Sequence, residues 1–251
     1  MMEGMKKRAE GQRLRGGLTK SVIDYRADAM ERFGRLSSFM ATTIFSNEAD
    51  YLLSIQCKES LPLSSAKQSP ICTYVSQTEV GIVPSLLSFF QLHNLHDQPS
   101  ESASSTLSKL GIQPENDIIY TDVRLYKALG HTYLKDAGHF TTNPSFLVSV
   151  ALSPLPTPEA EADFNAWYAE EHINLLSQVP GWQACRRFSL VDATKSTVDS
   201  ASLPRYLALH AYQDLDGFAS PQFRTATNTP WRTRVMQGIV ASERNVYRLA
   251  E

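Results

Sequence analysis

The 251-residue chain lacks several features that would indicate a common class of enzyme. It has three cysteines, Cys57, Cys72 and Cys185, whose number and spacing fit neither a disulfide framework nor a zinc site. It also has no Gly-rich phosphate loop, no Gly-x-Ser-x-Gly motif and no His-x-x-x-His helix. We therefore expect reduced cysteines, no metal site and no cofactor. A haem group stays open, because a single histidine ligand leaves no motif.

Net charge and long hydrophobic runs are equally scarce. The formal charge is −2, and no basic stripe is interleaved with aromatic residues, so we expect no nucleic-acid partner. No apolar run approaches the roughly 18 residues of a transmembrane helix, so we expect no membrane partner. A basic cluster at Lys6–Arg15 has no apolar segment beside it, which argues against a secretory signal. We expect a soluble cytoplasmic protein with a disordered basic tail at residues 1–20.

The second half of the chain has the clearer secondary-structure pattern. Four strand-like apolar segments alternate with two helical segments, and prolines mark the bends between them. The order β-α-β-β-α-β predicts a ferredoxin-like domain, which we place at residues 139–251. The predicted strands are 146–152, 182–191, 205–212 and 243–249, and the predicted helices are 159–178 and 215–238, the second broken at Pro221 and Pro230.

The first half resembles a divergent copy of the same domain, which we place at residues 21–138. Tyr51–Ile55 matches Tyr206–His210, and Val123–Tyr126 matches Asn245–Leu249. A chance match between short strands is the alternative. The predicted elements are helices at 21–33 and 80–95, strands at 36–45, 51–57, 71–75 and 118–129, and an exposed linker at 97–109.

A repeat of this kind has a physical reason. One ferredoxin-like unit covers one face of its sheet with helices and leaves the other face bare. Two units can pair their bare faces and close a barrel-like core within one chain. In the alignment above, Ile55 stands at the position of His210 and Ala29 at that of His172. We therefore expect any histidine chemistry to lie in the second half alone.

Motifs of the second half resemble those of a known family. Asp163–Ile173 resembles the first-helix motif of EthD-like and other dimeric α/β-barrel proteins, Val179–Trp182 their entry into the second strand, and Pro204–His210 their third strand. Thr229–Arg232 adds a pattern similar to fungal tandem-repeat members. The resemblance implies an α+β fold in which two repeats form a dimeric α/β-barrel-type pseudo-dimer. It assigns no single activity, because the superfamily includes cyclases, monooxygenases, lyases and haem enzymes.

The first helix of the second half carries a histidine beside its apolar face. At about 100° per residue, His172 and Glu171 fall within or beside the face that holds Tyr168. A histidine near neutrality can act as a general acid or base, with Glu171 and Tyr168 as neighbours in the substrate site. A structural histidine bonded to a backbone group is the alternative.

The strand at 205–212 presents two sets of side chains on opposite faces. We expect the set with hydroxyl and imidazole groups to face the space between the paired sheets, where the superfamily generally holds its ligand. Such groups can donate, accept and relay protons without a cofactor, although plain packing at a barrel interface is the alternative. The first set is Tyr206, Ala208, His210 and Tyr212, and the second set, expected to face the helices, is Leu207, Leu209 and Ala211.

Two arginines and two tryptophans complete the candidate site. Arg186 and Arg187 are adjacent in a strand and must face opposite sides, so one of them could bind a substrate oxygen. A salt bridge with Glu171 or another acid is the alternative. Trp182 and Trp231 offer flat apolar surface to a polycyclic or polyene ligand, or simply fill the core.

These residues favour a cofactor-independent cyclase, isomerase or lyase, in which His172, His210 and Tyr206 polarise or deprotonate the substrate. The expected partner is a hydrophobic terpenoid or polyketide intermediate of secondary metabolism, and a pericyclic reaction such as a Diels–Alder cycloaddition belongs to the same class. The alternatives are a cofactor-free monooxygenase and a non-catalytic small-molecule-binding protein. The chain could also pair further into a homodimer.

Overall fold

The fold is described from a computed structural model over residues 44–47, 49–57, 70, 72–76, 86–92, 102–112, 120–135, 143–194 and 202–250. The chain divides into two compact units, and the described residues belong to the unit formed by Ala41–Ala250. The tail expected at 1–20, the helix expected at 21–33 and most of the strand expected at 36–45 lie outside the described residues.

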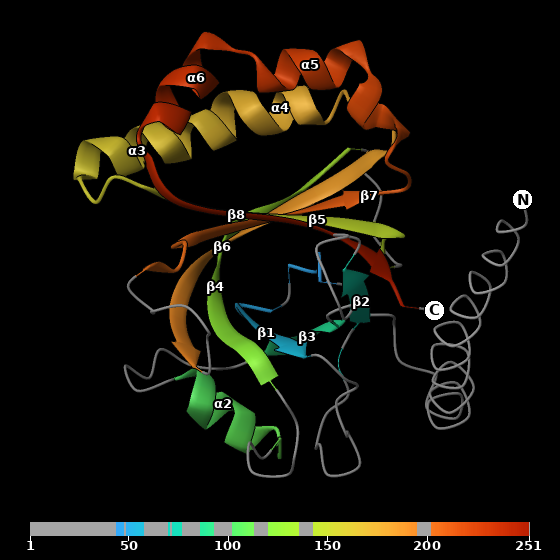
Figure 1. The fold of residues 1–251 in the computed structure, drawn as a ribbon, viewed down its shortest axis with the longest axis vertical. Helices are drawn as coiled ribbons and strands as arrows, with labels where there is room; N and C mark the ends of the chain where they lie inside the picture. Colours follow the sequence, from blue (N-terminus) through green and yellow to red (C-terminus); the bar gives the residue numbers. More distant parts are fainter. Residues whose placement is uncertain are drawn as a thin grey trace, which may run out of the picture. The chain divides into compact units, whose positions relative to one another are not determined.

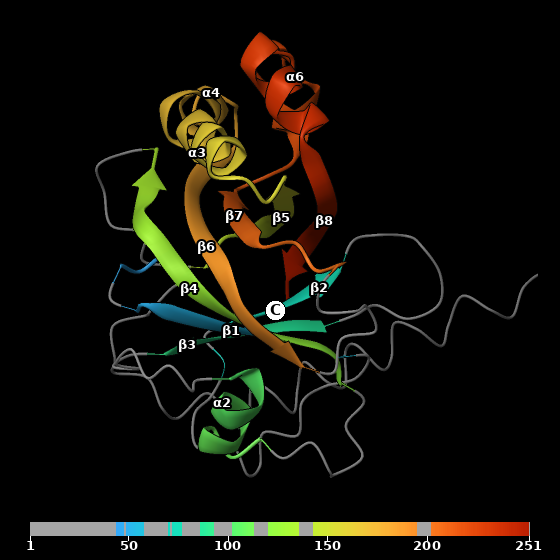
Figure 2. The same cartoon turned by 90° about the vertical axis from the view of Figure 1, so that its left-hand side faces the viewer.

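Eight strands form one closed barrel in which all pairs of neighbours are antiparallel (Figures 1 and 2). Around the barrel the order is β1-β3-β2-β8-β5-β7-β6-β4, and β4 pairs with β1 to close it. The mixed α/β fold with a barrel core is therefore confirmed. The strands are β1 (Tyr51–Cys57), β2 (Cys72–Ser76), β3 (Leu86–Leu92), β4 (Tyr120–Leu134), β5 (Phe146–Pro154), β6 (Trp182–Thr194), β7 (Tyr206–Tyr212) and β8 (Ile239–Leu249).

A layer of helices packs on the strands β5 to β8, and one short helix lies against β4 and β6 on the opposite side of the barrel (Figures 1 and 2). No helix among the described residues has the length and apolar character that a membrane crossing requires. The helices of the layer are α3 (Pro158–Trp167), the π-helical turn η2 (Tyr168–His172), α4 (Ile173–Leu176), the 3₁₀ turn η4 (Asp216–Ala219), α5 (Pro221–Thr227) and α6 (Pro230–Gln237), and the opposite helix is α2 (Ala103–Lys109).

Three helices of the layer begin with the same local signal, a hydroxyl residue followed by proline. The hydroxyl oxygen accepts a hydrogen bond from a backbone N–H of the first turn, and proline fits the first helical position because its missing N–H has no partner there anyway. Of the prolines predicted to bend or break the chain, Pro158, Pro221 and Pro230 are thus helix starts, whereas Pro154 ends β5. The pairs are Thr157 with Ala160, Ser220 with Phe223, and Thr229 with Arg232.

Side chains alternate along the strands between the barrel interior and the helices. The interior is filled mainly by apolar groups from both halves, such as Leu147, Phe188 and Leu209 of the second half and Phe89 of the first. A separate apolar cluster lies between the second-half strands and the helical layer. The barrel interior therefore serves as the common core of the two halves, and the helical layer covers a core of its own.

Two predictions for the first half were wrong. The helix predicted at 80–95 is the strand β3 where it is described, and both faces of this strand are buried, with Phe89 and Phe90 at 1% and 0% exposure. A strand buried on both faces has no alternation, and its apolar run resembles a buried helix. The linker predicted at 97–109 contains α2, which Ser102 and Ser105 start with a reciprocal capping box.

Candidate functional site

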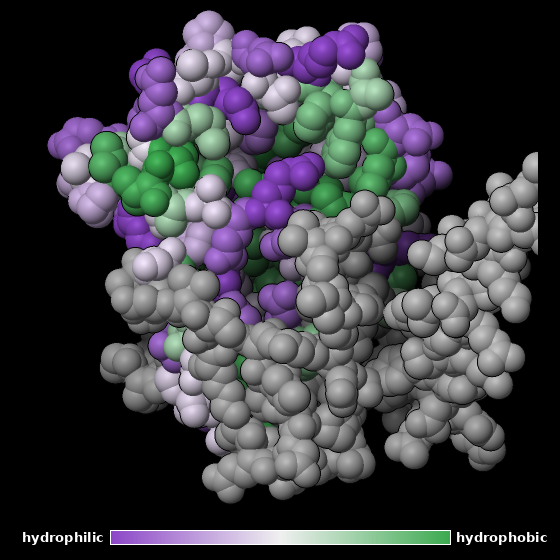
Figure 3. Space-filling view, in the orientation of Figure 1, coloured by the Kyte–Doolittle hydropathy of each residue, from purple (hydrophilic) through white to green (hydrophobic). Residues whose placement is uncertain are grey.

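A cavity of about 240 Å³ lies between the helical layer and the strands β5, β7 and β8. On the face drawn in Figure 3, hydrophobic surface gathers beside and beneath the helices, next to hydrophilic surface over the strands below. The cavity wall is mostly apolar, with a few polar groups among aliphatic and aromatic side chains. The wall includes Val148, Val150, Leu152, Trp167, His172, Leu176, His210, Tyr212, Phe218, Phe223, Thr227, Arg232, Met236, Ser242 and Arg244.

The orientation predicted for β7 was wrong. Leu207, Leu209 and Ala211 face the barrel interior, whereas Ala208 and Tyr212 pack with the helical layer. The interior of the closed barrel is a shared apolar core, so it takes the leucines of this strand. The face of β7 that carries His210 and Tyr212 therefore lines the cavity beneath the helices, together with His172 of the helical layer.

His172 occupies the end of the π-helical turn η2, between α3 and α4. Such single π turns are rare and often occur at functional sites. The backbone of Ala226 acts on the imidazole as an acceptor and raises its pKa, and Nδ1 is buried without a hydrogen-bond partner, so the nitrogen on which Ala226 acts is Nε2. A carbonyl accepts only, so Nε2 carries the hydrogen and Nδ1 holds a free lone pair.

Trp167 adds a second buried polar atom beside this imidazole. The rings of Trp167 and His172 are stacked, with centroids 4.2 Å apart and an interplanar angle of 23°. The indole Nε1 of Trp167 is buried and has no hydrogen-bond partner among the described residues. Both residues line the cavity, so the stacked pair places one unused acceptor and one unused donor just behind its surface.

His210 lies on β7 and lines the same cavity. It is 3% exposed, and its Nδ1 accepts a long hydrogen bond of 3.4 Å from Nε1 of the buried Trp182. A neutral imidazole that accepts at Nδ1 carries its hydrogen on Nε2. Trp182 therefore makes His210 a donor, the complement of the acceptor His172.

Both imidazoles are held in the neutral form. Burial lowers the pKa of His172 to about 3, and the charges of Arg232 and Arg187 act in the same direction. Burial also lowers the pKa of His210 to about 3, with smaller contributions from His172, Arg187 and Arg244. Neither histidine is protonated near neutral pH, so they act as a hydrogen-bond acceptor and a hydrogen-bond donor.

The predicted site residues fall into two groups. Of the ten, His172, His210 and Tyr212 line the cavity, and Trp182 supports it from behind through His210. Tyr206 and Tyr168 instead pack around Phe164, with ring centroids 5.2 Å and 5.1 Å from it. Neither tyrosine is part of the cavity wall.

Arg187 faces the helices without lining the cavity. Its Nη2 atom donates to Oδ1 of Asn165 at 2.7 Å, and its guanidinium lies 4.1 Å from the centre of the Tyr168 ring. Arg186 faces the other way, as predicted, and donates to the backbone carbonyls of Ile44, Ser46 and Ala49. Among the described residues, neither arginine makes the salt bridge considered from the sequence.

Glu171 and Trp231 hold the helices of the layer together. The carboxylate of Glu171 accepts a hydrogen bond of 2.6 Å from the hydroxyl of Thr229, at the start of α6. The indole of Trp231 donates to Asp163 of α3 over 2.9 Å. Both residues therefore connect α6 to the first helical segment and support the roof of the cavity.

Sequence reasoning missed three residues that carry the chemistry of the wall, Trp167, Arg232 and Arg244. Trp167 follows the apolar pattern of its helix, which predicts only core packing, and the side chain is indeed buried. Arg244 alternates with Glu243 along β8, and the period of two would have placed it on the helix side had the faces of the sheet been assigned correctly. Arg232 had no such signal, because a short helix after a proline has no clear period.

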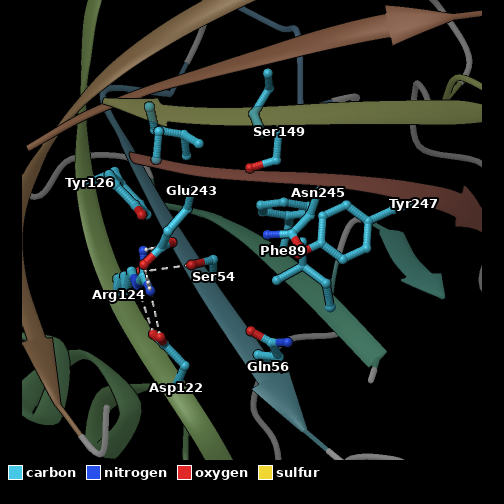
Figure 4. Close-up of a pocket in the computed structure, with 14 residues that line it drawn as sticks. Ser54, Gln56, Phe89, Asp122, Arg124, Tyr126, Ser149, Glu243, Asn245 and Tyr247 are labelled. Carbon is cyan, nitrogen blue, oxygen red and sulfur yellow. Dashed lines mark hydrogen bonds and ion pairs between the residues drawn. The ribbon is translucent and has the colours of Figure 1, made fainter. Parts of the chain in front are cut away.

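A second, smaller pocket of about 40 Å³ lies inside the barrel (Figure 4). Arg124 of β4 binds Asp122 through contacts of 2.6 and 2.8 Å and Glu243 of β8 through contacts of 2.7 and 3.0 Å. Figure 4 shows the guanidinium lying between the two carboxylates. The cluster therefore joins β4 of the first half to β8 of the second half. No group of three His, Cys, Asp or Glu side chains arranged for a metal ion occurs in the described part of the chain.

Several solved structures are similar to this chain at low sequence identity. An anthrone oxidase-like protein is 14% identical, with 84% of this chain and 93% of that chain covered and a TM-score of 0.48. A monooxygenase-like protein from Listeria innocua is 12% identical, with 80% and 94% covered and a TM-score of 0.40. The heme-degrading enzyme of Listeria monocytogenes is 10% identical, with 79% and 98% covered and a TM-score of 0.41. No protein-family model and no curated protein matches the chain.

Proposed function

We propose that the cavity binds a hydrophobic small molecule and that His172 takes a proton from it, in a cofactor-independent isomerisation, cyclisation or elimination. The observation that carries this proposal is Nδ1 of His172, a buried acceptor without a partner among the described residues, in a side chain that lines a mostly apolar cavity. An unpaired buried polar atom costs about 1–3 kcal/mol. A ligand that offers a hydrogen to Nδ1 removes that cost.

The two histidines divide the work. His210 donates through Nε2–H to a carbonyl oxygen of the ligand, as a neutral imidazole with a lowered pKa can. His172 accepts the proton from the adjacent carbon, and the indole N–H of Trp167 stabilises the resulting enolate oxygen. His172 then returns the proton at another carbon or gives it to a leaving group, so the protein ends each cycle unchanged.

The low pKa of His172 is compatible with this role. Its cause is burial without a counter-charge, together with nearby arginines. An enolate formed within a few ångströms supplies the missing negative charge and raises the pKa of the imidazole during the reaction. Proton transfer therefore creates an ion pair in place of an isolated buried cation.

The aromatic lining of the cavity favours a planar or polyene substrate. Trp167, Tyr212, Phe218 and Phe223 give the wall a high aromatic content. Aromatic rings bind flat apolar molecules with specific stacked or edge-on geometry. A terpenoid or polyketide intermediate fits this lining, and the site holds it in one reactive conformer.

We also propose that the two halves, residues 21–138 and 139–251, are ferredoxin-like repeats of the dimeric α/β-barrel type. Support comes from the strand order, since β4-β1-β3-β2 repeats the order β8-β5-β7-β6. In this order β1 is equivalent to β5, and β3 is equivalent to β7. This equivalence replaces the sequence alignment in which Ile55 stood at the position of His210. The strand β4 keeps its predicted counterpart β8.

The new equivalence of strands explains why the proposed chemistry lies in one half. When the first residues of β1 and β5 are aligned, Phe90 is equivalent to His210, Leu92 to Tyr212 and Val123 to Arg244. These three residues of the first half are buried and apolar. The first half therefore has the same strand order, but at these positions it has buried apolar side chains in place of the polar side chains of the cavity wall.

The proposal is tested by exchanging His172 for alanine in the host and comparing metabolites. A hydrophobic precursor should accumulate, and purified protein should convert it without added cofactor, with turnover at least about tenfold lower in the variant. His131→Ala is the matched control, because His131 is exposed and belongs to β4. Unchanged metabolites in the His172 variant would contradict a catalytic role.

The same assay separates the alternatives. A cofactor-free monooxygenase would use the same enolate but would consume O₂ in proportion to product, which an oxygen electrode measures. A binding protein would take up the precursor and release it unaltered, in both the wild type and the variant. Conversion without oxygen uptake supports the isomerase, cyclase or lyase class.

A further inference from the structure

The positive charge around the cavity is not balanced by acids. Arg232 and Arg244 both line the wall, and neither guanidinium has a salt bridge or hydrogen-bond partner in the described part of the chain. Arg244 lies 5.6 Å from the centre of the Phe218 ring, which keeps it at the edge of the cavity. Two cations thus border an apolar space.

The nearby carboxylates are engaged elsewhere. Glu243 contributes to the cavity wall, but its carboxylate binds Arg124 inside the barrel. Glu171 accepts the hydroxyl hydrogen of Thr229. Asp163 accepts hydrogen bonds from Trp231 and from an exposed arginine of α6. None of these acids is therefore free to neutralise Arg232 or Arg244.

We propose that the ligand of this cavity is an anion, an apolar body carrying a carboxylate or an equally acidic oxygen, held at the cavity edge by Arg232 and Arg244. The inference rests on the proposed function, because it concerns the substrate of that same site. Arginine suits such a role, since its planar donor set matches a carboxylate and it remains charged at all relevant pH values.

The two histidines fit an anionic ligand as well. Apart from burial and the effect of His172 on His210, the groups that lower the pKa of His172 or His210 are arginines, namely Arg187, Arg232 and Arg244. Arg232 is half-buried and Arg244 is exposed, so a neutral ligand would leave both charges at the cavity edge without a partner. An anion offsets them and still leaves His172 neutral and able to accept a proton from the apolar part of the molecule.

The experiment uses two dyes that share an aromatic frame. 8-Anilinonaphthalene-1-sulfonate carries an anionic group, and N-phenyl-1-naphthylamine lacks it. Both are titrated into the full-length wild type, Arg232→Gln, Arg244→Gln and the double variant, with binding followed by dye fluorescence. Arg224→Gln is the matched control, because Arg224 is exposed on α5 and donates only to the carbonyl of Ala219.

The sulfonate dye should lose at least about tenfold in affinity in the double variant, as expected for charge-assisted hydrogen bonds. The neutral dye should change by less than about twofold, and the control should match the wild type. Equal losses for both dyes, or no loss for the sulfonate, would overturn the inference. Thr227→Trp, which fills the cavity, should release both dyes, and a sulfonate dye that stays bound would overturn it too.

The outcomes distinguish this inference from the proposed function. Discrimination between the dyes together with an unchanged metabolite profile in the His172 variant would leave an anion-binding cavity without catalysis. Turnover that depends on His172 but not on Arg232 or Arg244 would leave the catalysis and remove the anionic substrate.

Discussion

Trp182 donates its indole N–H to Nδ1 of His210 across 3.4 Å, and this single contact decides which nitrogen of His210 carries hydrogen. His172 carries its hydrogen on the same nitrogen, because the backbone of Ala226 favours a hydrogen on Nε2, but here the nitrogen left without a partner is Nδ1. One cavity therefore holds a histidine that accepts and a histidine that donates. The partners of the two rings, rather than the rings themselves, set these roles.

Trp182→Phe should remove the tautomer preference of His210 while keeping most of the packing. The loss of a partner for a buried nitrogen should lower the free energy of unfolding by about 1–3 kcal/mol. Long-range ¹⁵N–¹H spectra report the hydrogen position, and the variant should show both ring nitrogens partly protonated. Trp231→Phe is the control, because Trp231 donates to Asp163 instead. A hydrogen on Nδ1 of His210 in the wild type would contradict the assignment.

Stability should fall when the pH drops below the ordinary pKa of histidine. The folded state holds the pKa of His172 and of His210 at about 3, whereas an unfolded histidine titrates near 6.5. Below about pH 6.5 these histidines bind protons in the unfolded state but remain unprotonated in the folded state. Each histidine therefore lowers the free energy of unfolding by at most about 1.4 kcal/mol per pH unit, from about pH 6.5 down towards pH 3.

Urea unfolding at pH 7.5 and pH 5.5 measures this dependence, in a range where few carboxylates titrate. His172→Gln should lose less stability between the two pH values than the wild type loses. The exposed His131→Gln should behave like the wild type. The same loss in His172→Gln and the wild type would show that this imidazole is not held neutral.

Local signals explain how much of the fold could be predicted. The strands at 146–152 and 205–212 are short, apolar and bounded by proline, and the structure has them as β5 and β7 with ends shifted by one or two residues. The first half is less regular, because β3 is buried on both faces and α2 is built from serines. A strand without alternation and a helix without an apolar stripe give no period to detect.

The candidate site was predicted in part. His172, His210 and Tyr212 were identified as residue types suited to acid–base chemistry, and all three line one cavity. Which face of the sheet they occupy was wrong, because alternation separates two faces without saying which one meets the helices. Arg187 shows the same limit, since its contact with Asn165 depends on a helix register that the sequence does not specify.

Arg124 should be important for joining the two halves of the barrel. Its side chain is 10% exposed and binds both Asp122 and Glu243. Arg124→Met would leave two carboxylates close together in the barrel without a cation. Removing one member of a buried ionic cluster costs about 3–5 kcal/mol, and we expect a loss near the lower value, since the Glu243 side chain is 32% exposed.

Urea unfolding of Arg124→Met at low and high salt measures this loss. Combining Arg124→Met with Asp122→Asn and Glu243→Gln should recover most of the stability, because the unpaired charges are removed as well. A loss below about 1 kcal/mol in the single variant would place the cluster among ordinary surface ion pairs.

Gly217 should tolerate no side chain, although its backbone lies in an ordinary region. An added Cβ would overlap the carbonyl oxygen of Pro180 and stand 2.9 Å from Cγ1 of Val179. The oxygen belongs to the backbone, so the turn η4 must move away. The next residue, Phe218, lines the cavity, and Gly217→Ala should therefore weaken ligand binding as well as stability.

We expect Gly217→Ala to lower the free energy of unfolding by about 2 kcal/mol or more, as overpacking does, and to weaken N-phenyl-1-naphthylamine binding severalfold. Gly130→Ala is the comparison, because its φ of +64° is strained for alanine but nothing lies within 4 Å of the added Cβ. Its cost should be about 1 kcal/mol, with unchanged dye affinity because Gly130 lies on β4, outside the cavity wall. Equal dye affinity in both variants would mean that the position of Phe218 does not shape the site.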